Sequence, residues 1–144
     1  MQDVETLSEI AVDCGFHIHQ GLGPGLLESV YEALMASSLA PRGLSVERQK
    51  VIPVEFHGMS FAEGFRADLV VEDQLLIEVK SIDRLAPVHG KQLLTYLRLT
   101  KQPLGLLMNF GAATFKEGLR RVVNRHTNFA SSRLRVNQIP PSHP

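Results

Sequence analysis

The chain has 144 residues, of which 44% are hydrophobic, and its 15 Lys and Arg residues balance its 15 Asp and Glu residues. This length supports one soluble domain with a sizeable core, and no apolar run approaches the roughly 20 residues that cross a bilayer. A formal net charge of zero argues against a protein that binds nucleic acid through a broad basic surface.

The N-terminal third of the sequence predicts two helices. Thr6 followed by Glu9 suggests a capping box that opens a helix running to about Gln20. The glycine-rich segment 21–25 breaks this helix, and apolar residues at helical spacing predict a second one over 26–39. Cys14, the single cysteine, falls on the apolar face of the first helix, so we expect it to be buried. A cytoplasmic location fits one unpaired cysteine and an N-terminus that lacks the features of a signal peptide.

The middle of the chain predicts strands. Residues 46–56 and 61–71 are β-prone segments on either side of a His57-Gly58 turn. A third strand is expected over 75–80, after the polar turn 72–74.

The remaining sequence predicts a helix over 86–100, a strand over 104–110 and a closing helix over 114–124. The fold class is therefore α/β, with a central mixed β-sheet of about four strands flanked by α-helices. We expect one domain over 1–126 and a loosely ordered tail over 127–144.

Asp68, Glu78 and Lys80 form the most informative group of charges, since each lies on an otherwise apolar strand. Glu78 and Lys80 are two residues apart and so share one face of a strand. A three-residue loop at 72–74 would pair Val71 with Leu75 and hence Asp68 with Glu78, whereas a two-residue loop would turn Asp68 to the other face. Asp73 suits the left-handed position of such a loop.

Two acids beside an amine on apolar strands indicate a site, because buried charge is costly unless it is paired or coordinates a metal. Carboxylate oxygens suit Mg²⁺ or Mn²⁺, and the backbone carbonyl of Val79 could supply another ligand. A lysine beside such an ion is the minimum apparatus for phosphodiester hydrolysis.

Asp68 with Glu78-Val79-Lys80 resembles the PD-(D/E)xK nuclease signature, although Ala67 stands where the name has a proline. Gly25-Leu26-Leu27-Glu28-Ser29-Val30-Tyr31 resembles the opening motif of the GxxExxY family, which is assigned to the same superfamily. Further similarity lies in segments 64–69, 87–97 and 104–110, and the match covers roughly residues 15–125. The resemblance implies a restriction-endonuclease-like core related to RecB-type nucleases that carry a Gln-xxx-Tyr element.

The resemblance also implies roles for individual residues. Asp68 and Glu78 would be metal ligands, Glu28 a helix-borne carboxylate that reaches the metal directly or through water, and Lys80 the catalytic lysine. The structural alternatives are a surface pair of acids, an N-terminal acid favoured by the helix dipole, and a lysine in a salt bridge.

Four further residues are candidates for substrate binding. Gln92 and Tyr96 share a helix face and resemble the Gln-xxx-Tyr element, or they pack the helix against the sheet. Arg66 would bind phosphate or neutralise the acids. His89 would contact phosphate, or cap its helix or lie on the surface.

Two functions are compatible with this sequence: a metal-dependent nuclease acting on DNA or, less readily, RNA, and a catalytically silent module of the same fold that binds nucleic acid or protein. Residues 1–40 carry six acids and no Lys or Arg, whereas bases predominate from Lys116 onward. The basic end could contact phosphates, form a solvated face or pair with the acidic first helix. A homodimer could add binding surface, and no membrane association is expected.

Overall fold

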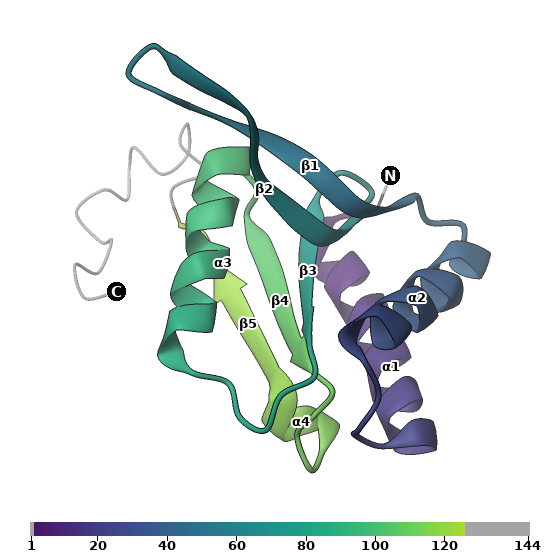
Figure 1. Cartoon of the computed structure of the whole chain (residues 1–144). Coiled ribbons are helices and arrows are strands. Elements are labelled where there is room, and N and C mark those ends of the chain that lie inside the picture. Colours follow the sequence, from purple (N-terminus) through teal and green to yellow (C-terminus); the bar gives the residue numbers. More distant parts are fainter. Residues whose placement is uncertain (1, 126–144) are drawn as a thin grey trace.

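A five-stranded mixed sheet forms the centre of the structure, a computed structural model in which residues 2–125 are described (Figure 1). The helices are α1 (Val4–Leu22), α2 (Glu28–Leu39), α3 (Pro87–Thr100) and the short α4 (Phe115–Gly118), and the strands are β1 (Val46–Phe56), β2 (Met59–Val71), β3 (Leu75–Lys80), β4 (Leu104–Asn109) and β5 (Leu119–Val123). The strand order is β1-β2-β3-β4-β5, in which only β3 and β4 run parallel. The predicted α/β class is confirmed, and the predicted tail lies outside the described residues.

Each face of the sheet packs against its own helices (Figure 1). Leu75, Ile77 and Val79 of β3 belong to the cluster under α1 and α2, whereas Leu76 belongs to the cluster under α3. Since side chains alternate along a strand, Glu78 falls on the α3 side of the sheet. None of the helices in residues 2–125 combines the length and hydropathy that a bilayer crossing requires.

The turn between β2 and β3 has the predicted register. Val71 pairs with Leu75 and Leu69 pairs with Ile77, so the connecting loop has three residues. Asp73 adopts a left-handed backbone with φ of 54°, and Glu72 before it does the same with φ of 53°. The loop therefore sets Asp68 and Glu78 opposite each other, one step beyond the last paired residues.

The start of α1 differs from the prediction. Asp3 caps this helix, because its Oδ1 accepts the amide hydrogen of Thr6 at 2.8 Å. Thr6 lies inside the helix, so the capping box predicted at Thr6 and Glu9 is wrong. Cys14 is buried as expected.

The predicted closing helix over 114–124 is also wrong. Only Phe115–Gly118 is helical, and Leu119–Val123 then pairs with β4 as an antiparallel edge strand. Gly118 lies directly on the end of β4, where a Cβ atom would come within 2.1 Å of the Asn109 carbonyl oxygen. Because the chain passes this close to β4 at Gly118, the residues that follow can pair with β4 as β5.

The hairpin of β1 and β2 projects beyond the rest of the sheet as an arm (Figure 1). Its outer part carries three exposed apolar side chains, Phe56, Met59 and Phe61. Phe56 pairs with Met59 and Val54 pairs with Phe61, so the three side chains lie on one face of the arm.

Candidate active site

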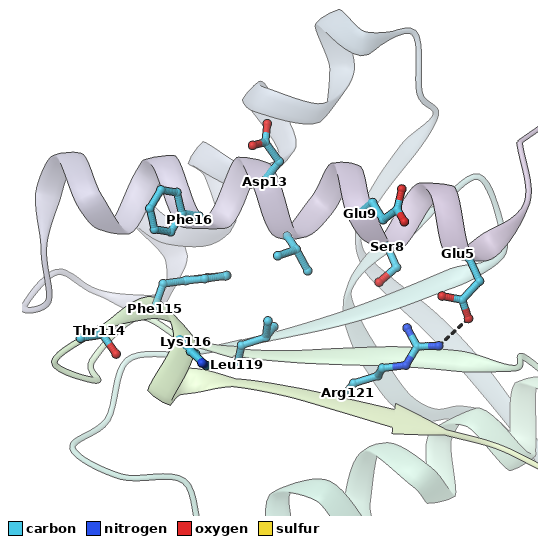
Figure 2. A pocket seen from close by; sticks show the side chains of 11 residues that line it. Glu5, Ser8, Glu9, Asp13, Phe16, Thr114, Phe115, Lys116, Leu119 and Arg121 are labelled. Carbon is cyan, nitrogen blue, oxygen red and sulfur yellow. Dashed lines mark hydrogen bonds and ion pairs between the residues drawn. The ribbon is translucent and has the colours of Figure 1, made fainter.

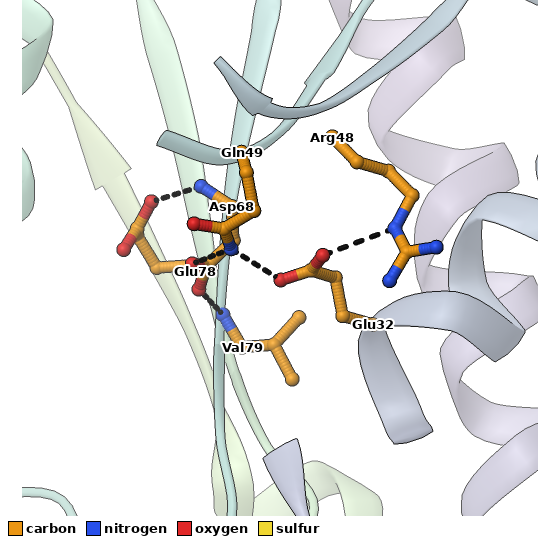
Figure 3. A network of polar contacts seen from close by, with 6 residues as sticks. All are labelled: Glu32, Arg48, Gln49, Asp68, Glu78 and Val79. Atoms are coloured by element: carbon orange, nitrogen blue, oxygen red, sulfur yellow. Dashed lines mark hydrogen bonds and ion pairs between the residues drawn. The ribbon is translucent and has the colours of Figure 1, made fainter. Parts of the chain in front are cut away.

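The backbone pairing between β2 and β3 stops at Leu69 and Ile77. Beyond this pair, two carboxylates accept the backbone amide hydrogens. The amide of Asp68 donates to Glu78 Oε2 at 3.0 Å, and the amide of Val79 donates to Asp68 Oδ2 at 2.8 Å (Figure 3). Each acid thus binds the backbone of the opposite strand. The arrangement brings both predicted acids to the point where the two strands part.

Burial makes the negative charge of this pair expensive. Glu78 is only 7% exposed. Burial, and then the charge of Asp68, raises the pKa of Glu78 from 4.5 to about 8. The pKa of Asp68 is also raised, chiefly by burial, and hydrogen bonds from Val79 and Gln49 partly offset that effect. A cation at this point would relieve the cost.

Lys80 lies close enough for its charge to lower the pKa of both acids. Within residues 2–125, however, no Lys, Arg or His nitrogen lies within 4.0 Å of an oxygen of Asp68 or Glu78. The structural alternative of a direct salt bridge to Lys80 is therefore not observed. The two acids therefore bind amide hydrogens rather than a cationic side chain, and the ammonium group of Lys80 acts on them from a longer distance.

The backbone of Val79 supports its proposed role as a ligand. The carbonyl of Lys80 accepts a hydrogen bond from Phe110, just beyond β4. Because backbone groups alternate in direction along a strand, the N–H and C=O of Val79 both point to the opposite edge, where Asp68 lies. The residues present therefore fit a hard divalent cation with two carboxylates and one carbonyl, the remaining ligands being water.

A third acidic side chain does not join this pair. Among the described residues, no group of three or more His, Cys, Asp and Glu side chains is arranged to hold a metal ion. Glu28, the first residue of α2, is exposed, and its Oε2 accepts the amide hydrogen of Ser81 at 3.4 Å. The structure thus places Glu28 beside the residue that follows Lys80 and does not group it with the two acids.

Tyr96 is a predicted substrate-binding residue that feels the charge of the acids. Its ring stacks on Phe65 with centroids 3.9 Å apart and planes inclined by 8°. Burial raises the pKa of Tyr96, and the charges of Glu78 and Asp68 raise it further. Tyr96 therefore packs the helix against the sheet, as its structural alternative expected, and also lies within electrostatic reach of the acid pair.

The other three candidates have partners or surroundings other than the acids. Gln92 is exposed one turn before Tyr96. His89 caps α3, because its Nδ1 accepts the amide hydrogen of Ala86 at 2.9 Å. Arg66 is exposed and pairs with Glu63 at 3.5 Å rather than with Asp68.

Sequence reasoning missed three residues that contact Asp68 directly or through one another: Arg48, Gln49 and Glu32 (Figure 3). Glu32 follows Glu28 by one helical turn, so its position facing the site could have been found from spacing. Gln49 could be found only from the pairing of β1 with β2, which the sequence does not specify.

A pocket of about 810 Å³ lies on the α1 side of the sheet, between α1 and β5 (Figure 2). Apolar side chains, among them Phe16, Phe115 and Leu119, line it together with acids of α1 and bases of the C-terminal part. Arg121 forms an ion pair with Glu5 across this pocket. Pairing with the acidic first helix therefore accounts for one of the basic residues, whereas Arg133 and Arg135 lie outside the described residues.

The chain belongs to the PD-(D/E)XK nuclease superfamily, whose family model matches residues 5–122. Members of this superfamily generally depend on a divalent metal. No curated protein matches the chain. Among solved structures, the crystal structure of SSO0001 is similar with 15% identity and a TM-score of 0.40, over 94% of this chain and 89% of that one.

Proposed function

We propose that the protein is a nuclease that uses Mg²⁺ or Mn²⁺ to hydrolyse phosphodiester bonds in DNA, or less readily in RNA. The observation that carries this proposal is the acid pair Asp68 and Glu78 in a chain of the nuclease superfamily. The two acids bind the backbones of opposite strands near Lys80, at the end of β3. Within that superfamily we assign the chain to the GxxExxY group. The single buried cysteine supports a cytoplasmic location.

The proposed roles follow from the positions of the side chains. Asp68, Glu78 and the carbonyl of Val79 would hold the ion, which when bound would acidify a water molecule and offset charge on the phosphate. Glu28 would act through a water molecule. Lys80 would orient the attacking water or stabilise the developing negative charge.

The surrounding residues would bind the substrate. Tyr96 lies within electrostatic reach of the acids, and Gln92 is one helical turn before it on the same face of α3, so both could contact a nucleotide. Arg66 would reach a phosphate by exchanging its exposed partner Glu63, and the free nitrogen of His89 would donate to another.

A cleavage assay with Mg²⁺ or Mn²⁺ tests this function on single-stranded, duplex and flap DNA and on single-stranded RNA. We expect Asp68→Asn and Lys80→Met to lower the cleavage rate at least about 100-fold. Lys101→Asn, which removes an exposed lysine at the left-handed residue after α3, should leave the rate unchanged. Cleavage that survives both site substitutions would contradict the proposal.

A catalytically silent module remains the second candidate, because only two acids meet at the site among the described residues. In that case the purified protein should bind one of the four nucleic acids, or a protein, without metal-dependent cleavage.

A homodimer would enlarge the binding surface of a chain whose net charge is zero. The molar mass in solution, measured by light scattering after size-exclusion chromatography, distinguishes a dimer from a monomer.

A further inference from the structure

Gln49 of β1 connects two acids with one amide group. Its Nε2 donates to Glu32 Oε1 at 2.7 Å and to Asp68 Oδ1 at 3.1 Å (Figure 3). A glutamine amide carries two hydrogens, so both are used by carboxylates. The side-chain amide is therefore held in one orientation.

The backbone of Gln49 is unusual at the same place. Gln49 has φ of 50°, a left-handed conformation that is uncommon for a residue other than glycine. Its neighbours Arg48 and Lys50 pair with Leu69 and Ala67, so Gln49 stands directly opposite Asp68. Strained backbone of this kind clusters at functional sites, where surrounding contacts hold it.

Glu32 and Arg48 hold the other end of this connection. Glu32 is only 6% exposed, and its Oε2 accepts a hydrogen bond from Arg48 Nε at 3.0 Å. The positive charge of Arg48 thus compensates Glu32, while Glu32 Oε1 remains bound to Gln49. Figure 3 shows this pair on the opposite side of Asp68 from Glu78.

We propose that Gln49 is a positioning residue for the metal site, an inference that rests on the proposed function. Gln49 holds Asp68 Oδ1 while the amide of Val79 holds Asp68 Oδ2. Each oxygen of a carboxylate can accept more than one hydrogen bond or ligand, so a fixed Asp68 still has lone pairs for a cation.

The neutrality of the amide is what suits it to this role. A lysine or arginine at position 49 could also hold Asp68, but its positive charge would repel a divalent ion bound to the same carboxylate. In this protein the neighbouring arginine, Arg48, forms its ion pair with Glu32 rather than with Asp68. Asp68 is therefore oriented without a competing charge.

Two substitutions test the inference. Gln49→Met keeps the length of the side chain and removes both hydrogen bonds. Gln49→Asn is too short to bridge Glu32 and Asp68, yet asparagine tolerates the left-handed backbone better than glutamine does, which offsets part of the cost of the lost hydrogen bonds. Gln102→Met is the matched control, because the side-chain amide of Gln102 donates to the carbonyl of Asp73 in an exposed loop and not to an acid.

The measurement is the dissociation constant of Mn²⁺ by titration calorimetry, with urea unfolding of the metal-free proteins alongside. Removing the partner that orients a metal ligand typically weakens metal binding about 10- to 100-fold. We expect a loss of that size for both Gln49 variants, cooperative urea unfolding for Gln49→Asn that shows a folded protein, and less than a twofold change for Gln102→Met.

Two results would overturn the inference, and they are distinguishable. If the unsubstituted protein binds Mn²⁺ and the Gln49→Asn variant binds it within twofold as tightly, Gln49 has no positioning role, although the metal site stands. If the unsubstituted protein binds no Mn²⁺ at millimolar concentration, the proposed function fails as well, because there is no ion to position.

Discussion

Glu78 gives the metal-free protein an unusual dependence on pH. Its pKa is about 8 in the folded state against 4.5 for the exposed group, so between these values the folded state holds a proton that the unfolded state has released. The contribution of protonated Glu78 to the free energy of unfolding is therefore fully present below about pH 4.5. It is lost as the pH rises toward 8. The raised pKa of Asp68 acts in the same direction.

The prediction is that Glu78→Gln removes most of this dependence. The metal-free protein should lose on the order of a few kcal/mol of unfolding free energy between pH 5.5 and 8.5, since one pKa unit corresponds to about 1.4 kcal/mol. Urea unfolding in the presence of EDTA measures it. The exposed Glu9→Gln variant is the control and should keep the decline, and a Glu78→Gln variant that declines equally would show that other groups cause it.

Metal binding should reverse the protonation of Glu78. A ligand carboxylate must be deprotonated, so loading the site at pH 7 with Mn²⁺ should release about one proton. Calorimetry in two buffers of different ionisation enthalpy counts the protons released. Proton release that persists in a Glu78→Gln variant would place the effect elsewhere.

Local spacing was enough to predict the acid pair but not the residues that orient it. The odd-numbered loop 72–74 and the alternation of β3 predicted that Asp68 and Glu78 face each other, and the register agrees. Glu32 and Gln49 meet Asp68 only because β1 has a left-handed residue within its pairing to β2. No local pattern predicts that conformation.

The last strand of the sheet, β5, shows why one helix was predicted in error. Leu119, Val122 and Val123 have the spacing of a helix face as well as the composition of a strand. In the structure Leu119 packs on the α1 side of the sheet and Val122 on the α3 side, which is the alternation of a strand. The free edge of β4, a tertiary feature, decides between the two.

Gly118 provides a test of this element. Gly118→Ala should destabilise the protein by roughly 2 kcal/mol or more, because its Cβ would meet backbone oxygen of β4, which cannot move aside as a flexible side chain can. Gly21→Ala, in α1 with no atom near the new methyl group, should instead stabilise by up to about 1 kcal/mol. Urea unfolding compares the two, and equal effects would contradict the assigned contact.

The zero net charge of the chain and its apolar arm both favour self-association. Phe56, Met59 and Phe61 are 62%, 53% and 55% exposed on the arm. A protein without net charge has little electrostatic repulsion between copies, so exposed apolar patches promote association.

Substituting Phe56 and Phe61 together by Ser should therefore reduce self-association near neutral pH. Stability should change by no more than about 0.5 kcal/mol per site, as is usual for exposed positions. Dynamic light scattering over a concentration series measures the association. Leu99→Ser, which removes an isolated exposed leucine of α3, is the control, and an equal effect from it would exclude a specific role of the arm.

The exchange of side-chain and backbone hydrogen bonds at the end of β3 has one more consequence. The amide hydrogens of Asp68 and Val79 are bonded to the very carboxylates that would ligate an ion. Their nuclear magnetic resonance frequencies and their protection from deuterium are therefore built-in sensors of occupancy. A change in these two amide signals would therefore report both the binding of an ion and the state of the contact between β2 and β3.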